Sequence, residues 1–218
     1  MTATIRGLPP GRAGRMWLVR SLDVAQRGAD LLEHKLRILI TEEHDFSLRA
    51  ERARREWEAA VAELDRWTMR AALISGERGF RLAGDGTDAR VDITWRTTMG
   101  VNYPSTVACS IDDSGHPTFA PDNSALVGVE EAAHAAVRAG AEYAVATTAL
   151  QSVRAEVQST RRKLRAIRER WVPRLEAAKA ALVFALDDQE HEEHVRLRWA
   201  SGAAEEGGRS DDSHSGSR

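Results

Sequence analysis

One heptad pattern constrains this chain more than any other feature of its sequence. Alternate steps of four and three residues from Leu18 reach 17 positions, of which 16 are apolar. These positions are Leu18, Leu22, Ala25, Ala29, Leu32, Leu36, Leu39, Glu43, Phe46, Ala50, Ala53, Trp57, Ala60, Leu64, Trp67, Ala71 and Ile74. Such a stripe predicts a coiled-coil helix. A helix that is slightly underwound, to 3.5 residues per turn, keeps an apolar stripe of this spacing against its partner helix along the whole length. At about 1.5 Å per residue, a helix from Arg15 to Ile74 would be roughly 90 Å long.

A second apolar stripe occupies the C-terminal half of the chain. Its positions are Tyr143, Thr147, Leu150, Val153, Val157, Thr160, Leu164, Ile167 and Trp171. The spacing then slips, since Leu175 follows Trp171 by four residues instead of three. Pro173 lies at the slip, and proline removes a backbone hydrogen bond and kinks a helix. We expect this helix to begin near a cap at Asn123 or Ser124 and to end near Trp199.

The segment between the two stripes has a different pattern. Ser75-Gly76 and Gly79 predict the end of the first helix. Val91, Ile93 and Trp95 alternate with polar residues, which indicates a strand. Residues 107–111 form a second candidate strand, and Asp112-Asp113-Ser114-Gly115 has the composition of a turn. We therefore expect a short β-hairpin with loops.

The predicted fold is dominated by α-helix: a long antiparallel two-helix coiled-coil hairpin with a short β-hairpin and loops in the middle. The expected segments are an N-terminal extension (1–14), helix one (15–75), the β-hairpin and loop region (76–122), helix two (123–199) and a disordered tail (200–218). If the connection joins residue 76 to about residue 127, the acidic Glu42, Glu43 and Asp45 lie beside Arg161 and Arg162. Exposed pairs of this kind contribute only about 0.2–1 kcal/mol each.

Composition narrows the class of protein. The 218 residues carry a net charge of −2, so no global field draws the chain to nucleic acid or anionic membrane. The single cysteine, Cys109, fits a reducing cytoplasm. No apolar run approaches the ~20 residues of a membrane span, and residues 1–15 lack the apolar core of a signal peptide. We expect a cytoplasmic chain, which does not exclude docking onto a membrane complex.

The residues that could carry chemistry also have simpler interpretations. His191 and His194 could share a metal ion, but no further ligand is evident in sequence, and a solvated helical face is favoured. The basic run from Arg154 to Arg174 could bind an acidic partner, but a coiled-coil exterior balanced by the other helix is favoured. Gly28 lies inside the predicted first helix, where it either allows close approach of another helix or subunit or is simply tolerated without such a role. The chain has no phosphate-binding loop and no nucleophile motif, so we expect no catalytic residue, metal or cofactor.

Three segments together resemble the D subunit of V-type and archaeal A-type ATPases. Arg15 begins the first, in which Arg27-Gly28-Ala29-Asp30-Leu31-Leu32-Glu33-His34-Lys35 is similar to the family's R-G-x-x-L-L-x-x-K stretch. Met99-Gly100-Val101 with Pro104 is similar to its M-G-V-x-x-P element. Trp171-Val172-Pro173-Arg174-Leu175-Glu176 is similar to its I-P-R-L-E element. Gly11-Arg12-Ala13-Gly14-Arg15 departs from the family's P-T-R start.

The resemblance implies a non-catalytic central-stalk subunit, the rotor shaft. In that role one copy inserts into a hexamer of A and B subunits. Its base binds a small F subunit and a funnel-shaped subunit that contacts the membrane ring, and rotation couples ATP synthesis or hydrolysis to proton or sodium movement. The alternative is a cytoplasmic coiled-coil adaptor that tethers partners without rotating.

Overall fold

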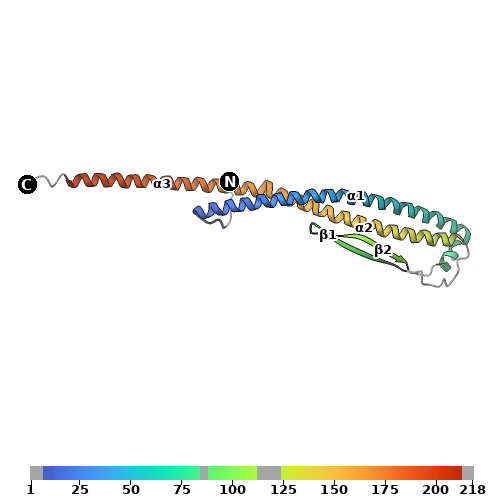
Figure 1. The fold of residues 1–218 in the computed structure, drawn as a ribbon. Helices are drawn as coiled ribbons and strands as arrows, with labels where there is room; N and C mark the ends of the chain where they lie inside the picture. The colour runs from blue at the N-terminus through green and yellow to red at the C-terminus, as the bar shows by residue number, and fades with distance from the viewer. Residues whose placement is uncertain (1–6, 84–87, 112–123, 213–218) are drawn as a thin grey trace, which may run out of the picture. The chain divides into compact units, whose positions relative to one another are not determined.

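The computed structural model describes residues 7–83, 88–111 and 124–212, with side chains up to Trp199 apart from Leu82 and Ala83. The elements in chain order are α1 (Gly11–Ala83), β1 (Ala89–Thr98), β2 (Val101–Ile111), α2 (Ser124–Ala166), the π-helix η1 (Ile167–Trp171) and α3 (Val172–Asp212) (Figure 1). The predicted fold class is confirmed, since long helices carry one two-stranded antiparallel sheet in the middle of the chain. The chain falls into two compact units: the middle unit holds residues 33–162, and the terminal unit combines residues up to 32 with those from 163 onward.

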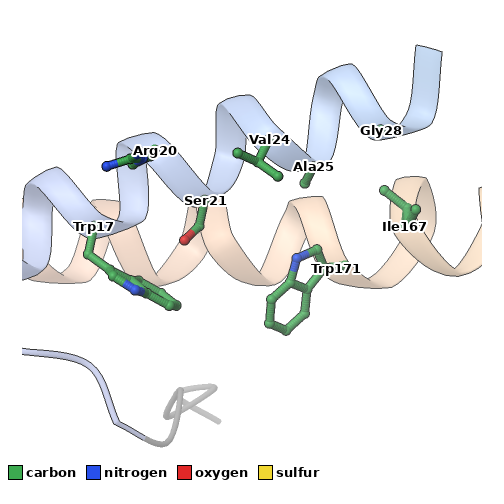
Figure 2. A pocket seen from close by; sticks show the side chains of 8 residues that line it. All are labelled: Trp17, Arg20, Ser21, Val24, Ala25, Gly28, Ile167 and Trp171. Atoms are coloured by element: carbon green, nitrogen blue, oxygen red, sulfur yellow. The ribbon is translucent and has the colours of Figure 1, made fainter. Parts of the chain in front are cut away.

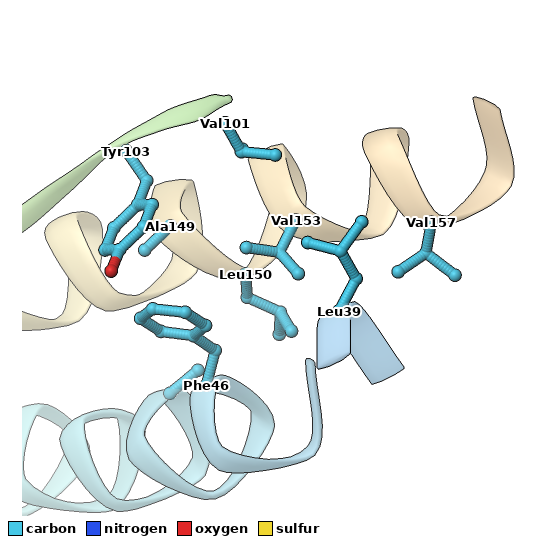
Figure 3. Close-up of a cluster of buried hydrophobic side chains, with 9 residues drawn as sticks. Leu39, Phe46, Val101, Tyr103, Ala149, Leu150, Val153 and Val157 are labelled. Carbon is cyan, nitrogen blue, oxygen red and sulfur yellow. The ribbon is translucent and has the colours of Figure 1, made fainter. Parts of the chain in front are cut away.

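The heptad stripe of α1 is the buried side of that helix. From Leu18 to Ala71 every stripe position is buried or half-buried, and only the last, Ile74, is exposed. In the middle unit, α1 packs on α2 through a core that Figure 3 shows; its large members include Leu39, Phe46, Leu150, Val153 and Val157. The sequence pattern alone located this packing surface, because period 3.5 is retained along the helix.

The two helices of the middle unit run antiparallel. Lys35 pairs with Glu156, and Trp57 stacks on Tyr143 with ring centroids 5.4 Å apart. Ala71 lies in one cluster with Leu126, near the start of α2. Successive contacts therefore move forward along α1 and backward along α2.

At Glu43 the predicted register is wrong by six residues, although the predicted kind of contact is present. Glu43 Oε1 lies 3.1 Å from Arg154 Nε, whereas the sequence placed Glu43 beside Arg161 and Arg162. The reason is the connection between the helices. Because Ala71 already packs against Ala125 and Leu126, the helices meet before residue 76 rather than at it.

Gly76 interrupts α1 as predicted, but the chain then resumes a helix. Gly76 has φ 60° and ψ −175°, a left-handed conformation that favours glycine. Helical conformation returns until Ala83, where the sequence predicted loops. This short segment has its own apolar anchor, because Phe80 packs on the cluster of Ala71 and Leu126.

The β-hairpin contains both predicted strands, and β2 begins at Val101, before the predicted start at residue 107. Met99 and Gly100 form the two-residue turn, and both have positive φ, 51° and 79°. Positive φ at both positions defines a type I′ turn, which suits a twisted two-residue hairpin. The predicted turn at 112–115 lies outside the residues that the structure describes.

The predicted slip in the second stripe has a structural cause in the terminal unit. Residues Ile167–Trp171 form a π-helix in which the backbone N–H of Val172 donates to the carbonyl of Ile167, five residues earlier. One extra residue is accommodated in this turn, so Leu175 is fully buried while Trp171 is 39% exposed. Pro173 follows directly and lacks the N–H that a regular helix would use.

The end of α3 differs from the predicted tail. The structure assigns helix up to Asp212, whereas the sequence predicted disorder from residue 200. Ala203-Ala204-Glu205-Glu206 are favourable helix formers that continue the preceding helix. The last part of the predicted tail, 213–218, lies outside the described residues.

Candidate functional site: interaction surfaces

The first group of residues that carry the family resemblance lies on α1. Their side chains differ in how far they are exposed to solvent. In the terminal unit Arg15 and Leu31 are exposed, whereas Leu32 lies half-buried on the stripe. In the middle unit Lys35 Nζ lies 2.6 Å from Glu156 Oε1, and both side chains are only about a quarter exposed. The hydroxyl of Thr160, which is 1% exposed, donates to the same carboxylate oxygen at 3.4 Å. A polar contact at an apolar seam favours one register of the two helices.

The second group forms the tip of the hairpin and its attachment. Met99 and Gly100 make the turn, while Val101 is buried in the helical core of the middle unit. Pro104 pairs with Trp95 next to a bulge, at which Ser105 Oγ donates to the carbonyl of Thr94 at 3.1 Å. Tyr103, the residue that fixes the hairpin, was not predicted from the sequence. Alternation in β2 offered a weak signal for it, but the partner ring was not predictable.

Tyr103 attaches the hairpin to α1. Its ring meets Phe46 edge to face, with centroids 4.9 Å apart and an interplanar angle of 71° (Figure 3). Its hydroxyl lies 3.0 Å from Thr98 Oγ1. Aromatic edge-to-face pairs add about 0.5–1.5 kcal/mol beyond burial. The hairpin is therefore held to the helices by the first residues of β2.

The outer strand of the hairpin presents large apolar side chains to solvent. Val91, Ile93 and Trp95 alternate along β1 and so share one face, and they are 45%, 45% and 54% exposed. Met99 at the turn is 46% exposed. The helices of the middle unit leave these four side chains about half uncovered, which is typical of residues that a partner covers.

The third group surrounds the π-turn in the terminal unit. Leu175 packs on Leu18 in the apolar cluster of this unit, and both are fully buried. Pro173, Arg174 and Glu176 are exposed. The motif therefore combines one residue that packs with three that face outward.

A pocket that the sequence did not predict lies beside this turn. Trp17, Ser21, Val24 and Gly28 of α1 line it together with Ile167 and Trp171 of η1, and Arg20 and Ala25 complete the lining (Figure 2). Its cavity volume is about 540 Å³, and the lining is largely apolar. The slip at Trp171 and the glycine at position 28 were its only signals in the sequence.

The positive charge of the basic run from Arg154 to Arg174 is offset in part by acidic residues of α1. Arg154 pairs with Glu43, and Arg168 Nη2 lies 3.9 Å from Asp30 Oδ1. Within the described residues no group of three or more potential metal ligands occurs, and that includes the surroundings of His191 and His194. What the described surface offers is apolar and charged contact area.

Comparison with known proteins identifies the family. Residues 16–202, which are most of the chain, match the family of the ATP synthase D subunit. The chain belongs to the ATP synthase D-subunit family. The expected resemblance is thereby confirmed.

Relatives in this D-subunit family match along most of their own length. The chain is 29% identical over 193 residues to the D subunit of the A-type ATP synthase of Methanopyrus kandleri, covering 87% of this chain and 83% of that protein. It is 26% identical over 200 residues to the D subunit of the A-type ATP synthase of Methanobrevibacter smithii, covering 89% and 86%. Among the described residues, no helix is long and apolar enough to cross a membrane.

Proposed function

We propose that this chain is the non-catalytic central-stalk subunit of an A/V-type ATP synthase, the rotor shaft that couples the nucleotide sites of an A/B hexamer to ion movement. In this role it binds no nucleotide, metal or cofactor of its own. One copy works per complex, on the cytoplasmic side and peripheral to the membrane. Its partners are the A and B subunits, the F subunit and the funnel-shaped subunit.

The observation that carries the proposal is the buried heptad stripe of α1. Only Gly76 interrupts the helical backbone of α1, and stripe positions are buried in both compact units. A chain that transmits torque needs a long supported helix rather than an enclosed site, because twisting one end must move the other. The helices of the two units supply such support through apolar clusters around Leu18 and Leu175 and around Leu39 and Val153.

The hexamer contact is proposed for the start of α1 and the adjoining turns of α3. Arg12 pairs with Glu190 across these elements, with Nη2 and Oε1 3.1 Å apart. Trp17 and the exposed Arg15, Arg196 and Arg198 give this region a mixed surface. Such a surface can move between equivalent positions of a hexamer because no single contact dominates.

The experiment that tests the proposal is ATP-driven ion pumping by the reconstituted complex. Leu32→Pro should abolish pumping, because proline inside a helix costs about 3 kcal/mol or more and interrupts the stripe. Single alanine substitutions at Arg15, Arg196 and Arg198 serve as controls and should lower pumping only modestly. Normal pumping with Leu32→Pro, or complete loss from one of these alanines, would contradict the torque-transmission proposal. Sizing of the complex should give one copy per hexamer.

The base-side contact is proposed for the β-hairpin. Its exposed apolar row on β1 supports this contact, because half-exposed Val91, Ile93 and Trp95 cost free energy in water unless a partner covers them. Deleting residues 85–115 should weaken binding of the F subunit or the funnel-shaped subunit while α-helical circular dichroism is largely kept. Unchanged binding of both subunits to a deleted chain that stays helical would exclude this docking role.

A further inference from the structure

The first two turns of α1 bury no large apolar side chain of their own. From residue 11 to residue 17 every residue is exposed or half-buried apart from Gly14, and Leu18 is the first large side chain that is buried. Arg12 pairs with Glu190 of α3, but the two side chains are 87% and 60% exposed. An exposed ion pair of this kind contributes little to stability. The residues of α1 therefore do not explain by themselves how its first turns are held on α3.

The apolar contact that these turns lack comes from residues 7–10, here called the N-terminal strap. Leu8 is half-buried and packs in the cluster that contains Leu18 and Leu182. Because Leu8 precedes Leu18 by ten positions, the chain must turn back along α1 before the helix begins (Figure 1). The helix rises about 10 Å from Gly11 to Leu18, and three extended residues also span about 10 Å. A strap of this length therefore reaches the first buried leucine of α1.

Two glycines and two prolines give the N-terminal strap its conformation. Gly7 and Gly11 flank it with φ of 84° and 69°, in the left-handed region that favours glycine. Pro9 and Pro10 between them have a fixed φ and no backbone N–H. A segment without these donors can lie against an apolar cluster without burying an unpaired N–H. The strap is thus a stiff segment between two glycine pivots.

Gly14 makes room for the N-terminal strap. A Cβ atom placed on Gly14 would overlap the carbonyl oxygen of Pro9 and would lie 3.2 Å from Leu182 Cδ2. The leucine methyl is the end of a flexible side chain, so a small rotation relieves that contact. The carbonyl of Pro9 is part of a stiff backbone, so it cannot move without displacing the strap. A residue other than glycine at position 14 therefore excludes the strap from its place.

We propose that the N-terminal strap is a latch that caps the apolar cluster of the terminal unit, with Gly14 as its seat. When the latch is closed, Leu8 covers Leu18 and the first turns of α1 are held on α3. When it is open, the strap swings about Gly11, Leu18 is uncovered and these turns are free to fray. The latch belongs to the chain alone and needs no partner subunit. It gives a structural role to the stretch 11–15, where the sequence departs from the family's start.

Hydrogen exchange of the full-length chain tests the latch through the sign of one substitution. In a helix without a strap, Gly14→Ala should slow exchange of the amides of residues 15–22 about fivefold, which corresponds to the helix preference of about 1 kcal/mol for alanine over glycine. With the latch seated on Gly14, the same substitution displaces the strap and should speed exchange at least fivefold. Gly28→Ala is the matched control. It lies in the same helix and the same unit, and its Cβ would meet no atom within 4 Å, so it should slow local exchange.

Removal of the strap should restore the ordinary sign. In a chain that lacks residues 2–10, Gly14→Ala should slow exchange of residues 15–22 relative to the same shortened chain without the substitution. Leu8→Ala should speed this exchange about fivefold in the parent, since it removes a half-buried apolar side chain, and less than twofold in the Gly14→Ala background. Exchange of residues 36–50 in the middle unit is the internal reference and should stay the same in every variant.

Three results would overturn the latch. The first is unchanged or slower exchange with Gly14→Ala in the full-length chain. The second is equal acceleration by Gly14→Ala in the chain without residues 2–10, because alanine would then be displacing Leu182 rather than the strap. The third is a full effect of Leu8→Ala in the Gly14→Ala background, because Leu8 would then pack without the seat. All three are measured on the isolated chain, so they are independent of the rotor function.

Discussion

The π-turn at Ile167–Trp171 makes a deletion of one residue tolerable at this place and at few others. Ile167 and Leu175 pack in one cluster although they are eight residues apart. At about 100° per residue, eight residues overshoot two turns by about 80°, whereas seven fall short by about 20°, which supercoiling absorbs. Deleting Arg170 should therefore convert η1 to regular α-helix and keep Leu175 buried. Pro173 must be changed to alanine at the same time, because proline inside a regular helix costs about 3 kcal/mol.

A matched deletion elsewhere should behave differently. Removing the exposed Arg161 from α2, where the helix is regular, rotates the following residues by about 100° relative to the preceding ones. Leu175 and Leu182 would then leave their cluster, and loss of one buried and one half-buried leucine costs roughly 2–5 kcal/mol. The deletion of Arg170 with Pro173→Ala should instead stay within about 1 kcal/mol of the parent, and the deletion of Arg170 alone should lose about 3 kcal/mol.

Urea unfolding measures these differences. Circular dichroism at 222 nm follows the helices of both units. If the deletion of Arg170 with Pro173→Ala destabilises the chain as much as the deletion of Arg161, the extra residue is not what the π-turn accommodates. The slip in the second stripe would then need another cause.

Two further substitutions test the attachment of the hairpin and the register of the helices. Tyr103→Ala should cost about 3–5 kcal/mol in urea unfolding, and a double-mutant cycle with Phe46→Leu should give a coupling of about 0.5–1.5 kcal/mol; no coupling would mean that the ring contact does not hold the hairpin. Lys35→Ala should cost roughly 1–2 kcal/mol because its partner Glu156 is three-quarters covered, whereas Arg154→Ala, which breaks a more exposed pair, should cost at most about 1 kcal/mol. Equal effects of these two substitutions would show that burial does not distinguish the two pairs.

The sequence by itself determined most of the secondary structure and the buried faces of the helices, although it did not predict the helical segments 77–83 and 200–212. Local periodicity is sufficient for this, because a helix turns by a fixed angle per residue and its apolar stripe must be covered. The stripe from Leu18 to Ala71, the break at Gly76 and the slip before Leu175 were all visible before any contact was known. The short hairpin was predictable for the same reason, since alternation in Val91, Ile93 and Trp95 has period two.

The register and the surfaces were decided by the tertiary structure. A heptad stripe has the same period everywhere, so it can slide by one heptad with little change in pattern. The six-residue error in placing Glu43 shows this, because the level at which Ala71 meets Leu126 depends on how the connection folds. Pairing of Lys35 with Glu156 is a contact between helices that no local pattern specifies.

The pocket between Trp17 of α1 and Trp171 of η1 has the same origin. Trp17, Gly28 and Trp171 are unremarkable as single residues, and 143 positions separate Gly28 from Trp171. Only the packing of α1 beside η1, with one extra residue in the π-turn, brings them to one hollow. The change in apolar spacing between Trp171 and Leu175 was visible in the sequence. Which side chains line the pocket was decided by the tertiary structure, because the lining depends on which residues of α1 lie opposite η1.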